Sequence, residues 1–169
     1  MNETGIAQPL QLYQCTVLPE WIDYNQHMMD GYYAVAFSYA TDAFLDYVGL
    51  DAAYRARSGC STYTAEGHLL FLHELKAGAP LQFTTQLLGY DAKRLHLFHA
   101  MHHATEHFLA ATCEWLMVHV DVKQGRGAQL PPAATTALAT IHEQQATLPW
   151  PVQAGRVISL QNKRSPGNN

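Results

Sequence analysis

The residues best suited to chemistry lie together in one short segment, residues 21–33. Within it, Asp23 and His27 follow a strand-like run and come just before a stretch that predicts a long amphipathic helix. A helix N-terminus offers unpaired backbone N–H groups and partial positive charge, and a nearby carboxylate can act as a nucleophile or a general base. This pairing suits cleavage of an activated carbonyl such as a thioester, in which negative charge builds up on one oxygen.

A second group of candidates lies on a predicted strand further along the chain. Glu66 and His68 alternate with Gly67 and Leu69, so strand periodicity puts them on one face, together with Glu74. A carboxylate there could serve as a second acid or base, and Glu66 is the candidate. The alternatives are an exposed strand face or a buried pair with His68.

The long helix has to position Asp23 and His27. Apolar residues recur at helical spacing over residues 29–48, which predicts a helix of that length with Asp30 as its N-cap and Gly49 just past its end. A strand is expected before it, because residues 10–18 alternate between apolar and polar side chains. The first turn of the helix would therefore meet the end of the preceding segment.

Four more strand-like stretches follow the helix, and their short connections favour antiparallel pairing. A weaker Ala/Thr-rich helix is expected from Pro131-Pro132 to about Ala146. The predicted strands are residues 61–74, 81–90, 95–103 and 108–122.

This order of elements predicts an α+β fold, with one long helix wrapped by a curved five-stranded antiparallel sheet and a C-terminal helix. We expect one domain over residues 1–150, followed by a polar, loosely ordered tail over residues 151–169. The open edge of the sheet favours pairing with a second copy, so a homodimer or homotetramer is expected.

Composition limits the possible functions. The 169 residues are 48% hydrophobic and 14% charged, which is typical of a folded domain, and the net charge of −4 does not favour nucleic-acid binding. No run reaches the roughly 18 apolar residues that a membrane span needs, and residues 1–11 do not resemble a secretion signal. The three widely spaced cysteines favour neither a disulfide framework nor a zinc site. We therefore expect a cytoplasmic protein.

The clustered histidines raise the question of a metal. His99, His102, His103 and His107 are close in sequence, but on a strand His99 and His103 would share one face while His102 takes the other. They do not converge readily as ligands. We therefore expect solvent-facing or interface histidines, and neither a metal nor another cofactor.

The segment around Asp23 resembles the hotdog-fold thioesterases of the 4-hydroxybenzoyl-CoA thioesterase type, over roughly residues 13–122. In that family an Asp is often followed by His four residues later, by an apolar residue at five, by Asn at seven and by Tyr at ten. The corresponding residues here are Asp23, His27, Met28, Asp30 and Tyr33. The chain departs from the pattern at Asp30, where the family has Asn, and at Gln26, where it usually has Gly.

The run from Glu20 to Met28 looks closer still to a subgroup linked to carnitine breakdown and betainyl-CoA. The resemblance implies hydrolysis of a small acyl-CoA to a free acid and coenzyme A. A trimethylammonium acyl group would favour aromatic faces, and Trp21 is one of several aromatic residues near the motif. Packing in the core would account for Trp21 equally well.

The resemblance also implies roles for single residues. Asp23 would attack the thioester or activate water, the backbone N–H of Asp30 would polarise the carbonyl, and His27 would orient the Asp or contact the thioester. Asn25 would fix the carboxylate. Each has a structural alternative, namely a capping carboxylate for Asp23, a packed imidazole for His27 and an Asx turn for Asn25.

The remaining candidates would contact the substrate. Met28 and His68 are assigned to the acyl site, as is Tyr33, whose ring is expected in the core with its hydroxyl towards the pocket. Lys93 and Arg94 lie at a predicted turn between strands. In the family such residues often hold the coenzyme A phosphates, which charge and bidentate Arg geometry make reasonable. A solvated turn is the alternative.

Two other functions remain open at this stage. Hotdog hydratases resemble Asp-x-Asn-Pro-x-His, whereas His27 follows Asp23 by only four residues and no Pro intervenes, which argues against an enoyl-CoA hydratase or dehydratase. A non-catalytic acyl-CoA-binding module is compatible with the departures at Gln26 and Asp30.

Overall fold

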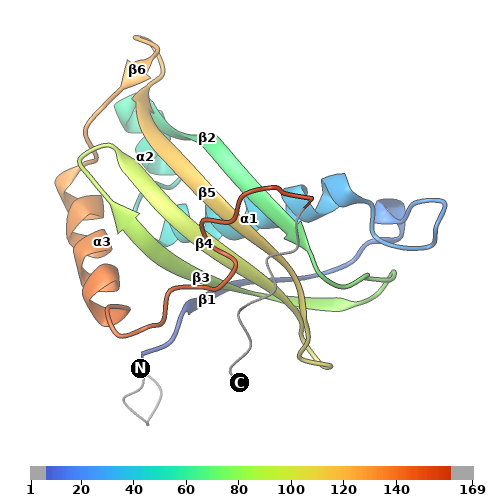
Figure 1. Ribbon diagram of the computed structural model, residues 1–169. Helices are drawn as coiled ribbons and strands as arrows, with labels where there is room; N and C mark the ends of the chain where they lie inside the picture. Colours follow the sequence, from blue (N-terminus) through green and yellow to red (C-terminus); the bar gives the residue numbers. More distant parts are fainter. Residues whose placement is uncertain (1–6, 161–169) are drawn as a thin grey trace.

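One antiparallel sheet with five long strands forms the body of the protein (Figure 1). The computed structural model describes residues 7–160, and the strand order is β1-β3-β4-β5-β2, so that β1 and β2 are the edges. A two-residue strand, β6 (Arg126–Gly127), pairs with the end of β5. The long strands are β1 (Leu10–Thr16), β2 (Cys60–Phe71), β3 (Pro80–Tyr90), β4 (Arg94–His103) and β5 (Leu109–Asp121).

The long helix α1 (Asp30–Tyr47) packs against one face of this sheet (Figure 1). Its buried stripe includes Tyr33, Phe37 and Phe44, at the spacing of an amphipathic helix. Phe37 meets the Phe83 ring of β3 edge-on, with centroids 5.7 Å apart. The sheet and the long helix therefore form the two layers that the sequence predicts, and that prediction is confirmed.

A buried polar contact fastens α1 to the sheet. The imidazole of His99 on β4 hydrogen-bonds Thr41 of α1 at 3.1 Å and Thr85 of β3 at 2.9 Å. His99 is fully buried, and desolvation lowers its pKa from 6.5 to about 3. The ring is therefore neutral at ordinary pH, and its two nitrogens serve as one donor and one acceptor.

Two shorter helices and a 3-10 turn complete the fold. The C-terminal helix α3 (Pro132–Gln144) packs against β3 and is confirmed as predicted. A 3-10 turn at Pro19–Trp21 and the short helix α2 (Ala52–Ser58) were not predicted from the sequence. Asp51 caps α2, because its side chain accepts from the backbone N–H of Tyr54 at 2.7 Å.

Two predicted boundaries were wrong. Met29, and not Asp30, is the N-cap of α1: Met29 is still extended (ψ 142°) and donates its N–H to Trp21. Asp30 is the first helical residue, and its side chain accepts from the N–H of Gly31 at 2.8 Å. Strand β2 ends at Phe71, before Glu74, because the chain turns away there and the N–H groups of residues 72 and 73 both donate to Ala110.

The segment after α3 crosses the sheet face opposite α1 (Figure 1). The Trp150 ring lies 6.0 Å from that of His96 on β4, and the Gly155 N–H donates to Glu114 of β5 at 2.7 Å. The first part of the predicted tail is thus held against the sheet, and residues 161–169 lie outside the described residues. Within residues 7–160, no helix is long and apolar enough to cross a membrane.

Candidate active site

The loop between the 3-10 turn and α1 folds tightly around the side chain of Asp23. Its Oδ1 accepts from the backbone N–H of Asn25 at 2.8 Å and from that of His27 at 3.4 Å. The Asp23 N–H donates to the His27 carbonyl at 2.9 Å, which closes the loop. To make this turn, Gln26 adopts a φ of 65°, in the left-handed region that glycine tolerates best.

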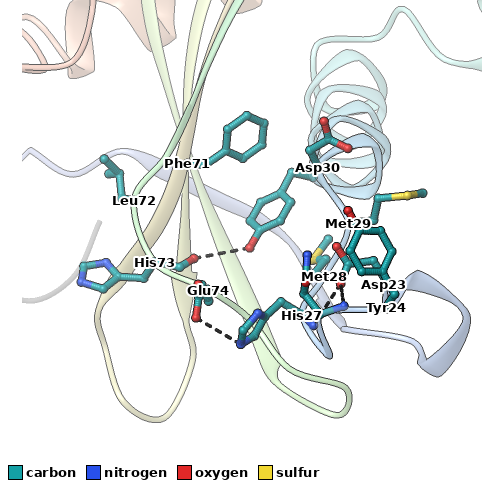
Figure 2. Close-up of a pocket in the computed structure, with 12 residues that line it drawn as sticks. Asp23, Tyr24, His27, Met28, Met29, Asp30, Phe71, Leu72, His73 and Glu74 are labelled. Carbon is teal, nitrogen blue, oxygen red and sulfur yellow. Dashed lines mark hydrogen bonds and ion pairs between the residues drawn. The ribbon is translucent and has the colours of Figure 1, made fainter.

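A pocket of about 860 Å³ opens beside this loop (Figure 2). Two segments far apart in sequence form it: the loop with the first turns of α1, and the end of β2 with the residues that follow. The lining residues are Asp23, Tyr24, Asn25, His27, Met28, Met29, Asp30, Tyr33, Phe71, Leu72, His73 and Glu74.

The start of α1 contributes a free donor to this pocket. The first N–H groups of a helix have no partner within the helix, and the N–H of Asp30 has no hydrogen-bond acceptor among residues 7–160. A carboxylate at Asp23 and an available N–H at Asp30 therefore line the same cavity. A base or nucleophile beside an oxyanion donor is what acyl transfer requires.

The segment after β2 contacts residues of the catalytic loop and of α1. Glu74 Oε2 lies 3.1 Å from His27 Nε2 (Figure 2). The Tyr33 hydroxyl donates to the His73 carbonyl at 3.4 Å, and burial raises the pKa of Tyr33 so that the hydroxyl keeps its proton. These contacts hold the two walls of the pocket together.

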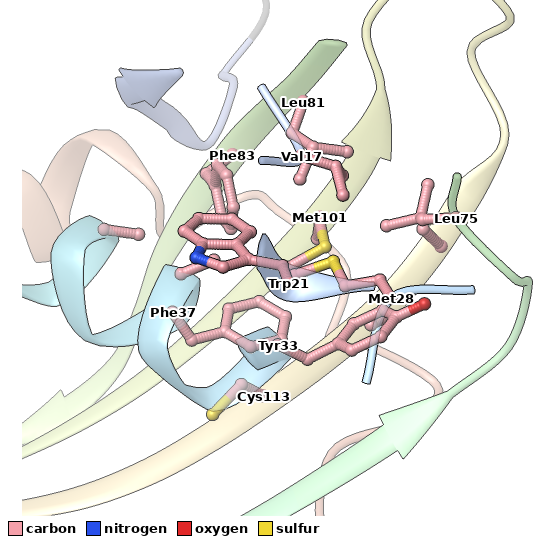
Figure 3. Close-up of a cluster of buried hydrophobic side chains, with 14 residues drawn as sticks. Val17, Trp21, Met28, Tyr33, Phe37, Leu75, Leu81, Phe83, Met101 and Cys113 are labelled. Carbon is pink, nitrogen blue, oxygen red and sulfur yellow. The ribbon is translucent and has the colours of Figure 1, made fainter. Parts of the chain in front are cut away.

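Most of the predicted site residues meet in this pocket. Alongside Asp23, these are Asn25, His27, Met28, Asp30 and Tyr33. Trp21 does not line it: Trp21 is 7% exposed and lies in the buried hydrophobic cluster (Figure 3). Its ring stacks on that of Tyr32, with centroids 5.6 Å apart. Its position in the buried cluster fits the core-packing alternative.

Glu66 and His68 lie elsewhere in the chain. They line a separate pocket of about 260 Å³ together with His96 and Glu114, on strands β2, β4 and β5. Neither is among the residues that line the pocket of Asp23. His96 Nε2 and Glu114 Oε1 are 2.7 Å apart in that second pocket, so the Glu114 carboxylate is already paired.

Lys93 and Arg94 are also remote from Asp23 within one chain. They lie at the β3–β4 turn next to β6, at the end of the sheet away from the start of α1 (Figure 1). Arg94 forms an ion pair with Asp91 at 2.6 Å, and this interaction lowers the pKa of Asp91 to about 2. β3 has 11 residues, or roughly 35 Å, so within one chain these cations lie at the far end of the sheet from the Asp23 pocket.

The second wall of the pocket was not predicted from the sequence. Phe71, Leu72 and His73 were not singled out, and Glu74 was assigned to a strand face with Glu66. No local pattern marks these residues, because the end of β2 and the loop after it follow Asp23 by almost fifty positions. Tertiary contacts bring this segment to the start of α1, among them the hydrogen bond from the Met28 N–H to the Leu75 carbonyl at 2.8 Å.

The clustered histidines do not converge. His99 is bound by two threonines, and His103 lies 3.6 Å from Glu106 at the β4–β5 turn. Across residues 7–160, no group of three or more His, Cys, Asp or Glu side chains has the arrangement of a metal site. His99 and His103 therefore have separate structural contacts. The prediction that they face solvent or an interface was wrong, because both are buried, at 0% and 8% exposure.

Comparison with known proteins adds independent information. The family model described as the thioesterase-like superfamily matches residues 17–138. The chain is 43% identical to a betainyl-CoA thioesterase of Pseudomonas aeruginosa, over 92% of this chain and 98% of that protein. It is 45% identical to part of an L-carnitine dehydrogenase/betainyl-CoA thioesterase of Agrobacterium fabrum, over 89% of this chain and 30% of that longer protein.

A solved structure shows the same fold. A hypothetical protein from Staphylococcus aureus, determined in complex with CoA, superimposes with a TM-score of 0.85 at 31% identity, over 90% of this chain and 97% of that one. The resemblance to hotdog thioesterases inferred from the Asp23 segment thus extends over almost the whole chain. Neither the hydratase nor the binding-only alternative is favoured by these relatives.

Proposed function

This chain belongs to the thioesterase-like superfamily and is an acyl-CoA thioesterase, and from that premise we propose that it hydrolyses betainyl-CoA to betaine and coenzyme A. The identity of the Pseudomonas relative supports this substrate, because the alignment spans nearly all of both chains. The observation that carries the mechanism is that Asp23 and the free N–H of Asp30 line one pocket.

In the proposed reaction, Asp23 acts on the thioester carbonyl. Its carboxylate takes a proton from a water molecule as the water oxygen attacks, or it attacks directly and the resulting anhydride is hydrolysed afterwards. The carbonyl oxygen becomes an oxyanion and accepts from the Asp30 N–H at the positive end of α1. The C–S bond then breaks, and coenzyme A departs as a thiolate that takes up a proton.

The neighbouring residues have supporting roles in this proposal. Two backbone N–H groups hold Asp23 Oδ1 in place, which leaves the other oxygen available for the substrate. His27, beside Glu74 at 3.1 Å, is a second group in the pocket able to hold a proton. Met28 and Tyr33 form the buried wall, at 4% exposure each.

We further propose that the enzyme works as a homodimer or homotetramer. Strand β2 pairs only with β5 in the described part of the chain, and its other side is an exposed edge of 12 residues. Such an edge invites pairing with a second copy. Phe71, the last residue of β2, lines the pocket, so a partner paired along β2 would border the active site and could bring its Lys93 and Arg94 to coenzyme A.

The proposed cellular setting is the cytoplasm, and no cofactor is needed beyond coenzyme A in the substrate. Support for the location comes from Cys15, Cys60 and Cys113, which are free thiols, as expected in a reducing compartment. Thioester hydrolysis itself needs only water, a base and an oxyanion donor, because the thiolate is a good leaving group.

A panel of acyl-CoA esters tests the proposed substrate. Thiol release would be followed with a thiol-reactive dye for betainyl-CoA, short aliphatic esters and aromatic esters. We expect the highest kcat/KM for betainyl-CoA. Faster thiol release from another class of ester would show that this class, and not betainyl-CoA, is the substrate. Tight binding of every ester without thiol release would support a binding module.

A further inference from the structure

The charged side chains that line the catalytic pocket are predominantly acidic. Three carboxylates line it, those of Asp23, Asp30 and Glu74, and none of its twelve lining residues is Lys or Arg. Glu74 is paired with His27, whereas neither Asp23 nor Asp30 forms an ion pair with any side chain of residues 7–160. An anionic acyl group would be repelled here, and a cationic one would be attracted.

Asp30 is the carboxylate that the hydrolytic reaction does not require. Its backbone N–H is the proposed oxyanion donor, so its own negative charge lies next to the place where negative charge develops. The negative charges of the Asp30 carboxylate and of the oxyanion therefore repel each other. A substrate that brings a positive charge close to its carbonyl would offset this repulsion, because the cation would lie between the two negative groups.

Two aromatic rings line the same pocket as Asp30. Tyr33 and Phe71 meet edge-to-face with centroids 5.2 Å apart and an interplanar angle of 85°, and both line the cavity. In Figure 2 the Asp30 carboxylate and the Phe71 ring lie towards one end of the pocket, and the His27–Glu74 pair lies towards the other. Ring faces attract quaternary ammonium groups within about 6 Å.

We propose that Asp30, with the rings of Tyr33 and Phe71, forms a subsite that selects acyl groups carrying a quaternary ammonium next to the thioester. This inference rests on the proposed thioesterase function and adds the residue that determines its charge preference. In a betainyl group the cation is one methylene away from the carbonyl carbon. A group bound at the Asp30 N–H therefore has its ammonium within reach of the Asp30 carboxylate.

The test compares two substrates of the same shape. Betainyl-CoA and its neutral isostere tert-butylacetyl-CoA differ by a positively charged nitrogen in place of a carbon. The quantity measured is the ratio of their kcat/KM values, for the wild type, for Asp30→Asn and for a control, Asp42→Asn, at an exposed residue of α1 outside the pocket. Asp30→Asn keeps an oxygen that can accept from the Gly31 N–H, so the start of the helix is retained.

We expect the wild type to favour the cation, and Asp30→Asn to lower that preference at least tenfold, which corresponds to about 1.4 kcal/mol. Phe71→Leu should lower it as well, and Asp42→Asn should leave it unchanged. An equal loss on both substrates in Asp30→Asn would overturn the charge-selecting role while leaving the thioesterase function intact. A wild type that hydrolyses neither ester would instead refute the proposed function itself.

Discussion

Gln26 shows how a single residue shapes the catalytic loop. Its φ of 65° is a conformation that costs a residue with a Cβ roughly 1–2 kcal/mol. The strain falls between Asp23 and His27, whose backbone groups close the turn. This geometry also explains why the resemblance points to Gly at this position, because glycine adopts positive φ without penalty.

Gln26→Gly should therefore stabilise the protein. We expect the free energy of unfolding to rise by about 0.5–1 kcal/mol, since the relief of strain exceeds the extra entropy that Gly brings to the unfolded chain. Urea denaturation of the wild type, Gln26→Gly and Gln26→Ala measures this, with Gln26→Ala close to the wild type. A less stable Gln26→Gly would show that the side chain makes a contribution larger than the strain.

The sequence could predict one side of the pocket and not the other, for a physical reason. Asp23, His27 and Asp30 lie within eight positions, so a local loop and a helix start are enough to bring them together. Glu74 reaches His27 only because β2 ends at Phe71 and the chain then turns. The apolar run Leu69-Leu70-Phe71-Leu72 continues past the end of the strand, so the pattern predicted a strand where tertiary contacts end one.

At the scale of elements, His99 links α1 to the middle of the sheet through Thr41 and Thr85. The folded protein holds this ring neutral, with a pKa of about 3 against 6.5 for an ordinary histidine. Below pH 6.5 the unfolded chain therefore binds a proton that the folded chain does not bind. Stability must fall as the pH decreases from 6.5 towards 3, by up to about 1.4 kcal/mol per pH unit.

A comparison at two pH values measures this contribution. Between pH 7.5 and pH 5.5, His99 should cost the wild type about 1.4 kcal/mol of unfolding free energy. His99→Gln, although less stable overall, lacks this titration and should lose about that much less over the same interval. Equal losses in both proteins, measured by urea denaturation, would show that His99 is protonated in the folded state.

Gly67 on β2 allows the edge strand to lie against Trp115 of β5. A Cβ at Gly67 would come within 1.9 Å of the Trp115 ring, whereas a Cβ at Gly89 would meet nothing within 4 Å. We expect Gly67→Ala to lower the free energy of unfolding by about 1–3 kcal/mol through overpacking, and Gly89→Ala to have a much smaller effect. Similar losses in both variants, measured by chemical denaturation, would contradict this account.

Long elements were predicted well and short ones were missed. The long helix was expected over residues 29–48 and runs from Asp30 to Tyr47, because many turns repeat the same apolar spacing. The helix α2 has only seven residues and none that is buried, so its apolar pattern is absent. Only Asp51 at its start and Gly59 at its end, with a φ of 67°, could have indicated it.

At the scale of the whole molecule, the free edge of β2 determines the expected assembly. Tyr63 on this edge is 52% exposed, and pairing of two β2 strands would cover it. Tyr63→Lys should weaken such pairing, because two lysines would face each other in the symmetric contact. The control is Tyr47→Lys on α1, which is 56% exposed and away from the edge.

Light scattering after size-exclusion chromatography gives the mass directly. We expect at least twice the chain mass of 18.8 kDa for the wild type and for Tyr47→Lys, and a smaller species for Tyr63→Lys. A wild type that is monomeric at all concentrations would rule out an active site completed by a second subunit.

The central claim, that the pocket beside α1 hydrolyses a thioester by means of Asp23, is tested most directly by the turnover of Asp23→Asn on betainyl-CoA. The Asn side chain still accepts from the Asn25 N–H, so the loop should fold normally, but it cannot act as a base or form an anhydride. We predict a fall in kcat of several hundred-fold, with unchanged unfolding and with normal turnover in the control Asp42→Asn. Near-normal turnover in Asp23→Asn would contradict the claim and assign the chemistry to another group.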